Sequence, residues 1–261
     1  FANLVVPRSF KRFPPTIQVI KFPVISGHNP FAIRTYAKDH RKILVVDDEI
    51  GYVGGYNIGE LYAKTWRDTH LRIKGPGVWE LANSFVDFWN THRTSKVDEL
   101  EDRGASEWEP RIRSVANLPD HMLFPVRGTY LDAINRATVS IEITQGYFLP
   151  DRSIVNALIA AADRGVEVRV LVPEFSNHVV ADWSARSLYD QLLDKNVRIF
   201  LFRHAMIHAK TMTVDGRWST IGTTNLDRLS LTGNYEINLE IYDNTLARAM
   251  SNVFLVDISN A

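Results

Sequence analysis

The chain has 261 residues, equal numbers of acidic and basic side chains, and no cysteine. Its length accommodates one large domain or two small ones, and the lack of cysteine excludes disulfides and thiol catalysis. The zero net charge argues against a partner bound mainly by phosphate neutralisation, such as nucleic acid, and no apolar run reaches the roughly eighteen residues of a membrane span.

The first third of the chain is predicted to hold short strands followed by one helix. Residues 1–16 mix proline with basic side chains, which is typical of a surface connection, and residues 23–36 are predicted to form a loop. Alternating or β-branched apolar runs predict strands at residues 17–22, 42–46, 52–55 and 69–73. After Gly75-Pro76, apolar side chains at helical spacing predict a helix that continues to Trp89.

Residues 94–128 are predicted to link two halves, 1–93 and 129–261, because they are charged and show no sustained period. The second half is expected to alternate strands and helices. The strands are predicted at residues 139–144, 166–172, 197–202 and 235–241, and the helices at 151–163, 182–196 and 245–259. This alternation implies right-handed crossovers and a largely parallel sheet covered on both faces.

One stretch of the first half recurs in the second with identical spacing. In both copies a His is followed by Lys after two residues, Asp after seven, Gly after 14, Asn after 17 and an acid after 28. The positions are His40, Lys42, Asp47, Gly54, Asn57 and Asp68 in the first copy, and His208, Lys210, Asp215, Gly222, Asn225 and Glu236 in the second. Core duplication gives no reason to keep two His, two Lys and two Asn, so we interpret the repeat as the functional centre.

The halves differ before the repeated stretch. The copies lie 168 residues apart (208 − 40), and this offset aligns the closing helices of the two halves. Nothing in the first half matches the strand and helix predicted within 139–163. We therefore expect the first half to lack its opening elements, and the intact protein to have more chain before residue 1.

The residue types of the repeat suit the binding of a phosphate group. A His and a Lys two residues apart on a strand point to the same face, which places an imidazole beside an ammonium group. The amides of Asn57 and Asn225 can donate hydrogen bonds to the same anion. Gly55 and Thr223 leave room for a close approach of the backbone.

Carboxylates complete the repeated set. Asp68 and Glu236 can hold the other ring nitrogen of each histidine, which fixes its tautomer and supports a positive or phosphorylated imidazole. Asp47 and Asp215 follow apolar strands. For these two, a structural role at the turn and direct participation in the chemistry both remain open.

Together the two copies resemble the HKD signature, His-x-Lys-x-x-x-x-Asp with trailing Gly and Asn, of the phospholipase D superfamily. The stretches 40–43, 54–58, 66–68 and 147–151 also resemble the bacterial cardiolipin synthase branch. The resemblance implies an α/β fold of two pseudo-symmetric halves, each with a mostly parallel mixed sheet flanked by helices. It implies that both motifs meet at one active site at the interface, without a metal or other cofactor. The signature often has Ser after the motif Gly, where this chain has Gly55 and Thr223.

The resemblance also implies a mechanism through a phosphohistidine. One histidine attacks phosphorus while the other protonates the leaving alcohol, and the second then deprotonates the incoming alcohol or water. Family analogy favours His40 as nucleophile and His208 as acid, although the near-symmetry of the copies leaves this choice open.

The leading expectation is therefore a phosphatidyltransferase that makes cardiolipin from phosphatidylglycerol. A phospholipase D that releases phosphatidic acid is the alternative, because the motif residues do not distinguish alcohol from water as acceptor. A nucleic-acid phosphodiesterase and a lipid-binding protein without activity are less favoured. Both motifs lie in one chain, so a monomer suffices for the site.

A phospholipid substrate implies contact with a membrane surface. We expect a location at the bacterial cell membrane, either peripheral or anchored by a segment before residue 1. Candidate apolar contacts are Phe31, Phe148, Leu149, Phe175 and Trp183, and for Trp183 ordinary packing is the preferred interpretation.

Overall fold

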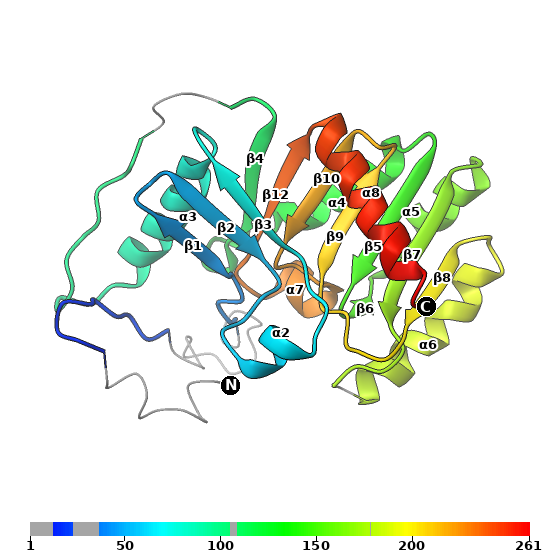
Figure 1. Cartoon of the computed structure of the whole chain (residues 1–261), viewed down its shortest axis with the longest axis horizontal. Helices are drawn as coiled ribbons and strands as arrows, with labels where there is room; N and C mark the ends of the chain where they lie inside the picture. Colours follow the sequence, from blue (N-terminus) through cyan, green and yellow to red (C-terminus); the bar gives the residue numbers. More distant parts are fainter. Residues whose placement is uncertain (1–12, 23–36, 105–108, 178) are drawn as a thin grey trace.

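The computed structural model describes residues 13–22, 37–104, 109–177 and 179–261, apart from the side chains of 179–181 (Figure 1). The first half contains a three-stranded antiparallel sheet in the order β1-β2-β3. Its strands are β1 (Ile43–Val46), β2 (Ile50–Gly54) and β3 (His70–Lys74). Helix α3 (Val78–His92) buries Val78 and Leu81 against this sheet.

The second half is built on a seven-stranded sheet in the order β4-β12-β10-β9-β5-β7-β8. These strands are β4 (Ile112–Asn117), β5 (Ser140–Gln145), β7 (Glu167–Pro173), β8 (Arg198–Phe202), β9 (Lys210–Val214), β10 (Trp218–Gly222) and β12 (Glu236–Tyr242). Only β5–β7 and β7–β8 pair in parallel, and the other neighbours are antiparallel.

Helices cover both faces of the large sheet. Helices α4 (Pro125–Arg136), α5 (Arg152–Asp163) and α6 (Val179–Leu193) pack on one face, where they bury Tyr130, Ile154 and Leu158. Helix α8 (Asn244–Ile258) crosses the other face, in front of the sheet in Figure 1, and buries Phe254 there. Because both faces are covered, all five residues of β9 and of β10 are buried.

The helix starts follow local capping chemistry. Asp151 accepts hydrogen bonds from the backbone N–H groups of Ser153 and Ile154 at the start of α5, as the sequence predicts. Asp243 accepts one from Leu246 N at the start of α8. These caps fix where each helix begins, and therefore how its apolar face meets the sheet.

Short elements gather at the lower edge of Figure 1. Helix α2 (Glu60–Lys64) follows β2, while β6 (Phe148–Leu149) pairs in parallel with β11 (Leu226–Asp227) and helix α7 (Arg228–Thr232) follows β11. A 3₁₀ turn, η3 (Pro119–His121), precedes α4.

The two halves share one of the hydrophobic cores. Ile237, Leu239 and Ile241 of β12 are buried together with Val53 of β2 and Leu81 of α3. A strand of the second half therefore closes the core of the first, and the interface between the halves is packed like a protein interior.

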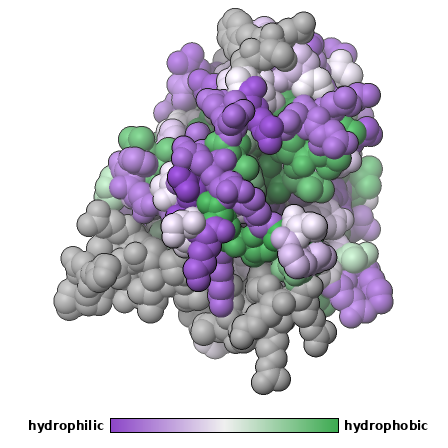
Figure 2. Space-filling view, turned by 90° about the vertical axis from the view of Figure 1, so that its left-hand side faces the viewer, coloured by the Kyte–Doolittle hydropathy of each residue, from purple (hydrophilic) through white to green (hydrophobic). Residues whose placement is uncertain are grey.

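The side of the molecule that carries α3 faces the viewer in Figure 2, where apolar surface lies between polar borders. Phe22 packs against Phe88 of α3, with ring centroids 5.3 Å apart, and Ile20 and Phe22 help line a small apolar cavity there. The predicted strand at 17–22 is wrong: these residues are not in a strand, and Phe22 packs on α3 instead.

The expected α/β fold with a mixed sheet flanked by helices is confirmed, but the balance of strand pairings differs from the expectation. The first sheet is antiparallel because a tight turn at 47–49 joins β1 to β2 as a hairpin. In the large sheet, only the crossovers through α5 and α6 create parallel pairs. The expected linker 94–128 is not free of structure either, since β4 pairs with β12 along its whole length and α4 begins at Pro125.

Candidate active site

The two repeated motifs are brought together by backbone hydrogen bonds between the halves. His40 N donates to Tyr235 O at 3.0 Å, next to Glu236 of the other half. In the mirrored arrangement His208 N donates to Arg67 O at 2.7 Å, next to Asp68. Each motif therefore starts beside the acid of the opposite copy.

A side-chain pair supports the second of these contacts. The Arg67 guanidinium donates to both carboxylate oxygens of Asp257 in α8, each at 2.9 Å. It also donates to the backbone oxygen of Asp68. A bidentate pair of this kind fixes direction as well as distance, so α8 holds the segment before β3 that carries Asp68.

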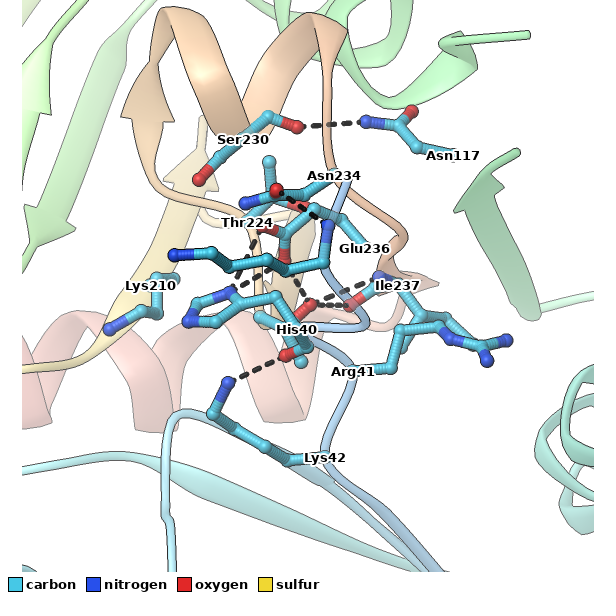
Figure 3. Close-up of polar contacts among 12 residues, drawn as sticks. His40, Arg41, Lys42, Asn117, Lys210, Thr224, Ser230, Asn234, Glu236 and Ile237 are labelled. Atoms are coloured by element: carbon cyan, nitrogen blue, oxygen red, sulfur yellow. Dashed lines mark hydrogen bonds and ion pairs between the residues drawn. The ribbon is translucent and has the colours of Figure 1, made fainter. Parts of the chain in front are cut away.

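Each histidine is hydrogen-bonded to the acid of the other half. His40 Nδ1 lies 3.0 Å from both carboxylate oxygens of Glu236, and Figure 3 shows this pair. His208 Nδ1 lies 2.9 Å from Asp68 Oδ2. Both carboxylates are fully buried. A carboxylate at Nδ1 leaves Nε2 of each ring for chemistry, as expected for His-orienting acids.

The two lysine ammonium groups lie beside the histidines and close enough for Lys42 to affect the pKa of Lys210. Lys42 Nζ donates to His40 O at 2.6 Å (Figure 3), and Lys210 Nζ donates to His208 O. Burial lowers the pKa of Lys42 to about 8, although Glu236 opposes this shift. Burial also lowers the pKa of Lys210 to about 7, and the nearby Lys42 adds to the shift. Two ammonium groups that destabilise each other form a site for an anion.

The two histidines differ in environment despite their common spacing. The His40 side chain is 29% exposed, whereas that of His208 is 4% exposed. Burial lowers the pKa of His208 to about 4, and Lys210 contributes to the shift. The hydrogen bond that the Asp68 carboxylate accepts from the ring opposes it. Burial therefore favours the neutral form of His208.

Gly55 and Thr223, which the sequence assigned to phosphate binding, contact the acids instead. A Cβ atom at Gly55 would overlap the carboxylate of Asp68. Thr223 Oγ1 donates to Glu236 Oε2 at 2.6 Å and accepts from Ile237 N at 3.0 Å. These two positions therefore seat the carboxylates, and the different residue types reflect the room beside Asp68 and Glu236.

The two asparagines also occupy different positions. Asn225 is buried, and its side-chain oxygen has no hydrogen-bond partner within the described part of the chain. Asn57 is exposed and hydrogen-bonds the Tyr62 side chain. Asn225 therefore lies in the enclosed site, and Asn57 lies at its surface.

Comparison with known proteins agrees with this geometry. Residues 130–258 match the family model described as "Cardiolipin synthase, PLD-like domain". A cardiolipin synthase of Listeria monocytogenes (serotype 4a, strain HCC23) is 31% identical over 256 residues, covering 94% of this chain and 51% of that protein. One of Staphylococcus aureus (strain Mu50) is 33% identical over 253 residues, covering 92% and 49%. The part of the chain that this model matches belongs to the phospholipase D superfamily, and the whole chain is similar to cardiolipin synthases.

Solved structures show the same fold. The phosphatidylserine synthase of Haemophilus influenzae Rd KW20 superposes with a TM-score of 0.63 at 18% identity, covering 83% of this chain and 61% of that one. Nuc of Salmonella typhimurium, titled a phospholipase D family member, superposes with a TM-score of 0.50 at 24% identity, covering 58% and 96%. The chain spans about half the length of the curated relatives it matches.

The Asp of each HKD motif of this phospholipase D homologue lies away from the histidines. Asp215 follows β9 at the end opposite Lys210, roughly 16 Å along an extended strand. Its carboxylate accepts from the backbone N–H groups of Thr138, Val139 and Ser140, at 2.8 to 2.9 Å. Burial alone would raise the pKa of Asp215, but these hydrogen bonds lower it. Asp47 occupies the matching turn at φ 54° and is exposed.

Neither a metal-binding cluster nor a membrane-spanning helix is found in the described part of the chain. Within residues 13–22, 37–104, 109–177 and 179–261, no group of three or more His, Asp or Glu side chains is arranged to hold a metal ion. Over the same ranges, no helix combines the length and apolar character needed to cross a bilayer.

Proposed function

We propose that this chain carries the catalytic site of a phosphatidyltransferase that transfers a phosphatidyl group from phosphatidylglycerol to an alcohol, as a cardiolipin synthase does. The observation that carries the proposal is the pair of His–Lys sets, each closed by a carboxylate from the opposite half. Similarity to cardiolipin synthases over more than nine tenths of the chain supports the substrate class.

In the first step one histidine forms a covalent intermediate. Nε2 of His40 attacks phosphorus, an N–P bond forms, and the bond from phosphorus to the glycerol oxygen breaks. The released oxygen takes a proton from His208. Glu236 accepts the Nδ1–H of His40, so positive charge on that ring is balanced as the bond forms.

In the second step the roles of proton donor and acceptor reverse. The hydroxyl of a second phospholipid attacks phosphorus, its proton passes to His208, and the N–P bond to His40 breaks. A buried, neutral His208 suits this base function. To act as acid in the first step it must gain a proton when the substrate anion offsets the charges of Lys210 and Lys42.

The lysines and Asn225 stabilise the transferring group. Lys42 and Lys210 place two cations where charge builds on the non-bridging oxygens, and buried donors act strongly there because water is excluded. Asp215 and Asp47 take no part in these steps. We assign both to the hairpin turns where they lie, with Asp215 also holding the start of β5.

The second candidate is hydrolysis, in which water replaces the acceptor alcohol and phosphatidic acid is released. Exposure of the His40 side chain favours it, because water has access to that ring. A nucleic-acid phosphodiesterase is a weaker candidate, since the chain carries 30 acidic and 30 basic side chains.

Access to a lipid substrate requires apolar surface near the membrane. Phe175 and Trp183 are 68% and 74% exposed, so the packed position preferred for Trp183 from the sequence is wrong. Phe148 is 3% exposed and belongs to the core, and Phe31 lies outside the described residues. We propose Phe175 and Trp183 as contacts with the surface of a bacterial membrane.

The deciding experiment is mass spectrometry of the products after the full-length protein meets phosphatidylglycerol vesicles. Cardiolipin together with free glycerol would establish transfer. Phosphatidic acid without cardiolipin would show that water is the acceptor and would replace the proposal by hydrolysis. No lipid product would refute both and direct the search to other phosphodiesters.

A further inference from the structure

Three aromatic rings surround His208. The centroids of the Tyr62 and Trp66 rings lie 5.4 Å and 5.3 Å from that of the imidazole, and the Tyr147 ring lies at 6.0 Å. Tyr62 and Tyr147 meet it edge to face, and Tyr62 also packs on Trp66 at 4.6 Å. We call these three residues the aromatic enclosure.

The enclosure is assembled from both halves. Tyr62 lies in α2 and Trp66 follows that helix, two residues before Asp68. Tyr147 stands between β5 and β6 of the second half. All three side chains are half-buried, so they lie between His208 and solvent. Behind the imidazole, a Cβ atom at Gly146 would come within 3.1 to 3.3 Å of His208 and Lys210, which leaves no room for water on that side.

His40 has no counterpart of this enclosure. The repeat offset of 168 places Ser230 and Asn234 where the first copy has Tyr62 and Trp66 (62 + 168 and 66 + 168). Among the described residues, no aromatic ring is recorded against His40. The two copies thus differ at the positions that supply two of the rings against His208, and the two histidine side chains differ in exposure, at 29% for His40 and 4% for His208.

We infer that Tyr62, Trp66 and Tyr147 are positioning residues that set the partition between transfer and hydrolysis by keeping water away from His208. The inference rests on the proposed transferase activity. Water and alcohol compete for one intermediate: either oxygen forms the new O–P bond, the N–P bond breaks, and the proton goes to the second histidine. Because the aromatic enclosure keeps water away from His208, the base is left to deprotonate the alcohol of a second phospholipid. Transfer is then favoured over hydrolysis.

The test is the product ratio in one reaction. Full-length wild type and the variants Trp66→Leu, Tyr62→Leu and Tyr147→Leu are incubated with phosphatidylglycerol vesicles, and cardiolipin and phosphatidic acid are quantified together. We expect each variant to raise the ratio of phosphatidic acid to cardiolipin several-fold. The ratio does not depend on the fraction of folded enzyme, so a loss of stability alone leaves it unchanged.

Two controls make the outcome decisive. Tyr242→Leu makes the same change as Tyr62→Leu at a side chain that is 59% exposed, and should leave the ratio at the wild-type value. Trp66→Phe and Tyr62→Phe keep a ring in place and should restore most of the transfer. If Trp66→Leu yields no product, Tyr62→Leu decides, because Tyr62 lies in a five-residue helix without buried residues.

The two proposals fail in different ways. Wild type that transfers, with all three leucine variants at the wild-type ratio, would refute the role of the enclosure and leave the transferase proposal intact. Wild type that produces phosphatidic acid alone would refute both, since intact rings would then fail to exclude water.

Discussion

At the scale of single residues, the site concentrates positive charge in a region that burial makes unfavourable for it. Lys42, Lys210 and His208 all have lowered pKa values, with burial as the largest cause in each. Asp68 and Glu236 oppose these shifts without cancelling them. The site is therefore poised to gain stability from a bound anion, which is the electrostatic requirement for phosphoryl chemistry.

The lysines predict a pH dependence of substrate capture. Their pKa values of about 7 and about 8 mean that both lose charge as pH rises through this range. Because the substrate is an anion, we expect kcat/KM to fall with increasing pH above about 7, with less effect on kcat, since a bound phosphodiester favours the charged lysines. A steady-state pH profile measures both quantities. A kcat/KM that stays level up to pH 9 would contradict the assignment.

The crossed acids predict which histidine each one controls. Asp68→Asn should change the imidazole titration of His208, because the Asp68 carboxylate is hydrogen-bonded to that ring. The hydrogen bond from Asp68 raises the pKa of His208, so its removal should lower that pKa further. NMR titration of the imidazole protons checks this. Glu236→Gln is the matched variant, and it should leave the titration of His208 at its wild-type value, because Glu236 bonds the other histidine.

At the scale of elements, the hairpins β1–β2 and β9–β10 carry the same motif with different surroundings. Asp215 accepts three backbone hydrogen bonds from residues 138–140, whereas Asp47 occupies the equivalent turn exposed to solvent. The Asp215 carboxylate therefore joins the second turn to the start of β5, whereas the first turn is held by its other residues, with Glu49 O accepting from Gly75 N and Asp48 paired with Arg103.

The two aspartates should consequently differ in their effect on stability. Asp215→Asn should reduce the free energy of unfolding by about 1–3 kcal/mol, because backbone donors lose their charged acceptor. Asp47→Asn should change it by less than about 0.5 kcal/mol, since Asn tolerates the same positive φ at an exposed turn. Denaturant titration measures both. A large loss of turnover in either variant with unchanged stability would assign that Asp to the chemistry instead.

The sequence predicted most long elements because their apolar periodicity is strong, as in α5 with its Asp151 cap. Strand β4 was missed because it is an edge strand whose apolar positions are interrupted by Arg113 and flanked by charged residues. Helix α4 is not predicted, although its buried residues Val126, Tyr130 and Ile134 recur every four residues. Most of its other residues are polar, and they obscure the apolar periodicity.

The residues of the site could be predicted from the repeat, but which carboxylate pairs with which histidine could not. The spacing between His and acid is the same within both copies, so it carries no information about pairing across 196 and 140 residues. The roles of Gly55 and Thr223 depend on atoms of the other strand that no local pattern encodes. Long-range packing decides both.

At the scale of the whole molecule, the halves form one site through backbone hydrogen bonds, a shared core and two histidine–carboxylate pairs. One chain holds every member of both pairs. Neither half closes its own site, since each histidine draws its carboxylate from the other.

This arrangement predicts the result of a complementation experiment. His40→Ala and His208→Ala should each lower turnover by at least about 10³-fold, because one chemical step then lacks its nucleophile or its proton carrier. Mixing the two inactive variants should restore no activity, as each molecule is complete within itself. Recovery of activity on mixing would show that halves exchange between chains. Wild type mixed with either variant serves as the control.

The crossed pairs also carry a consequence for descent. A half-length ancestor with one motif and one acid, folded like either half here, would have placed its acid out of reach of its own histidine. Two copies had to meet, each lending a carboxylate to the other, before either ring was oriented. Joining both copies in one chain keeps each carboxylate beside the histidine of the other copy. It also freed the copies to diverge, so that one could gain Tyr62 and Trp66 where the other has Ser230 and Asn234.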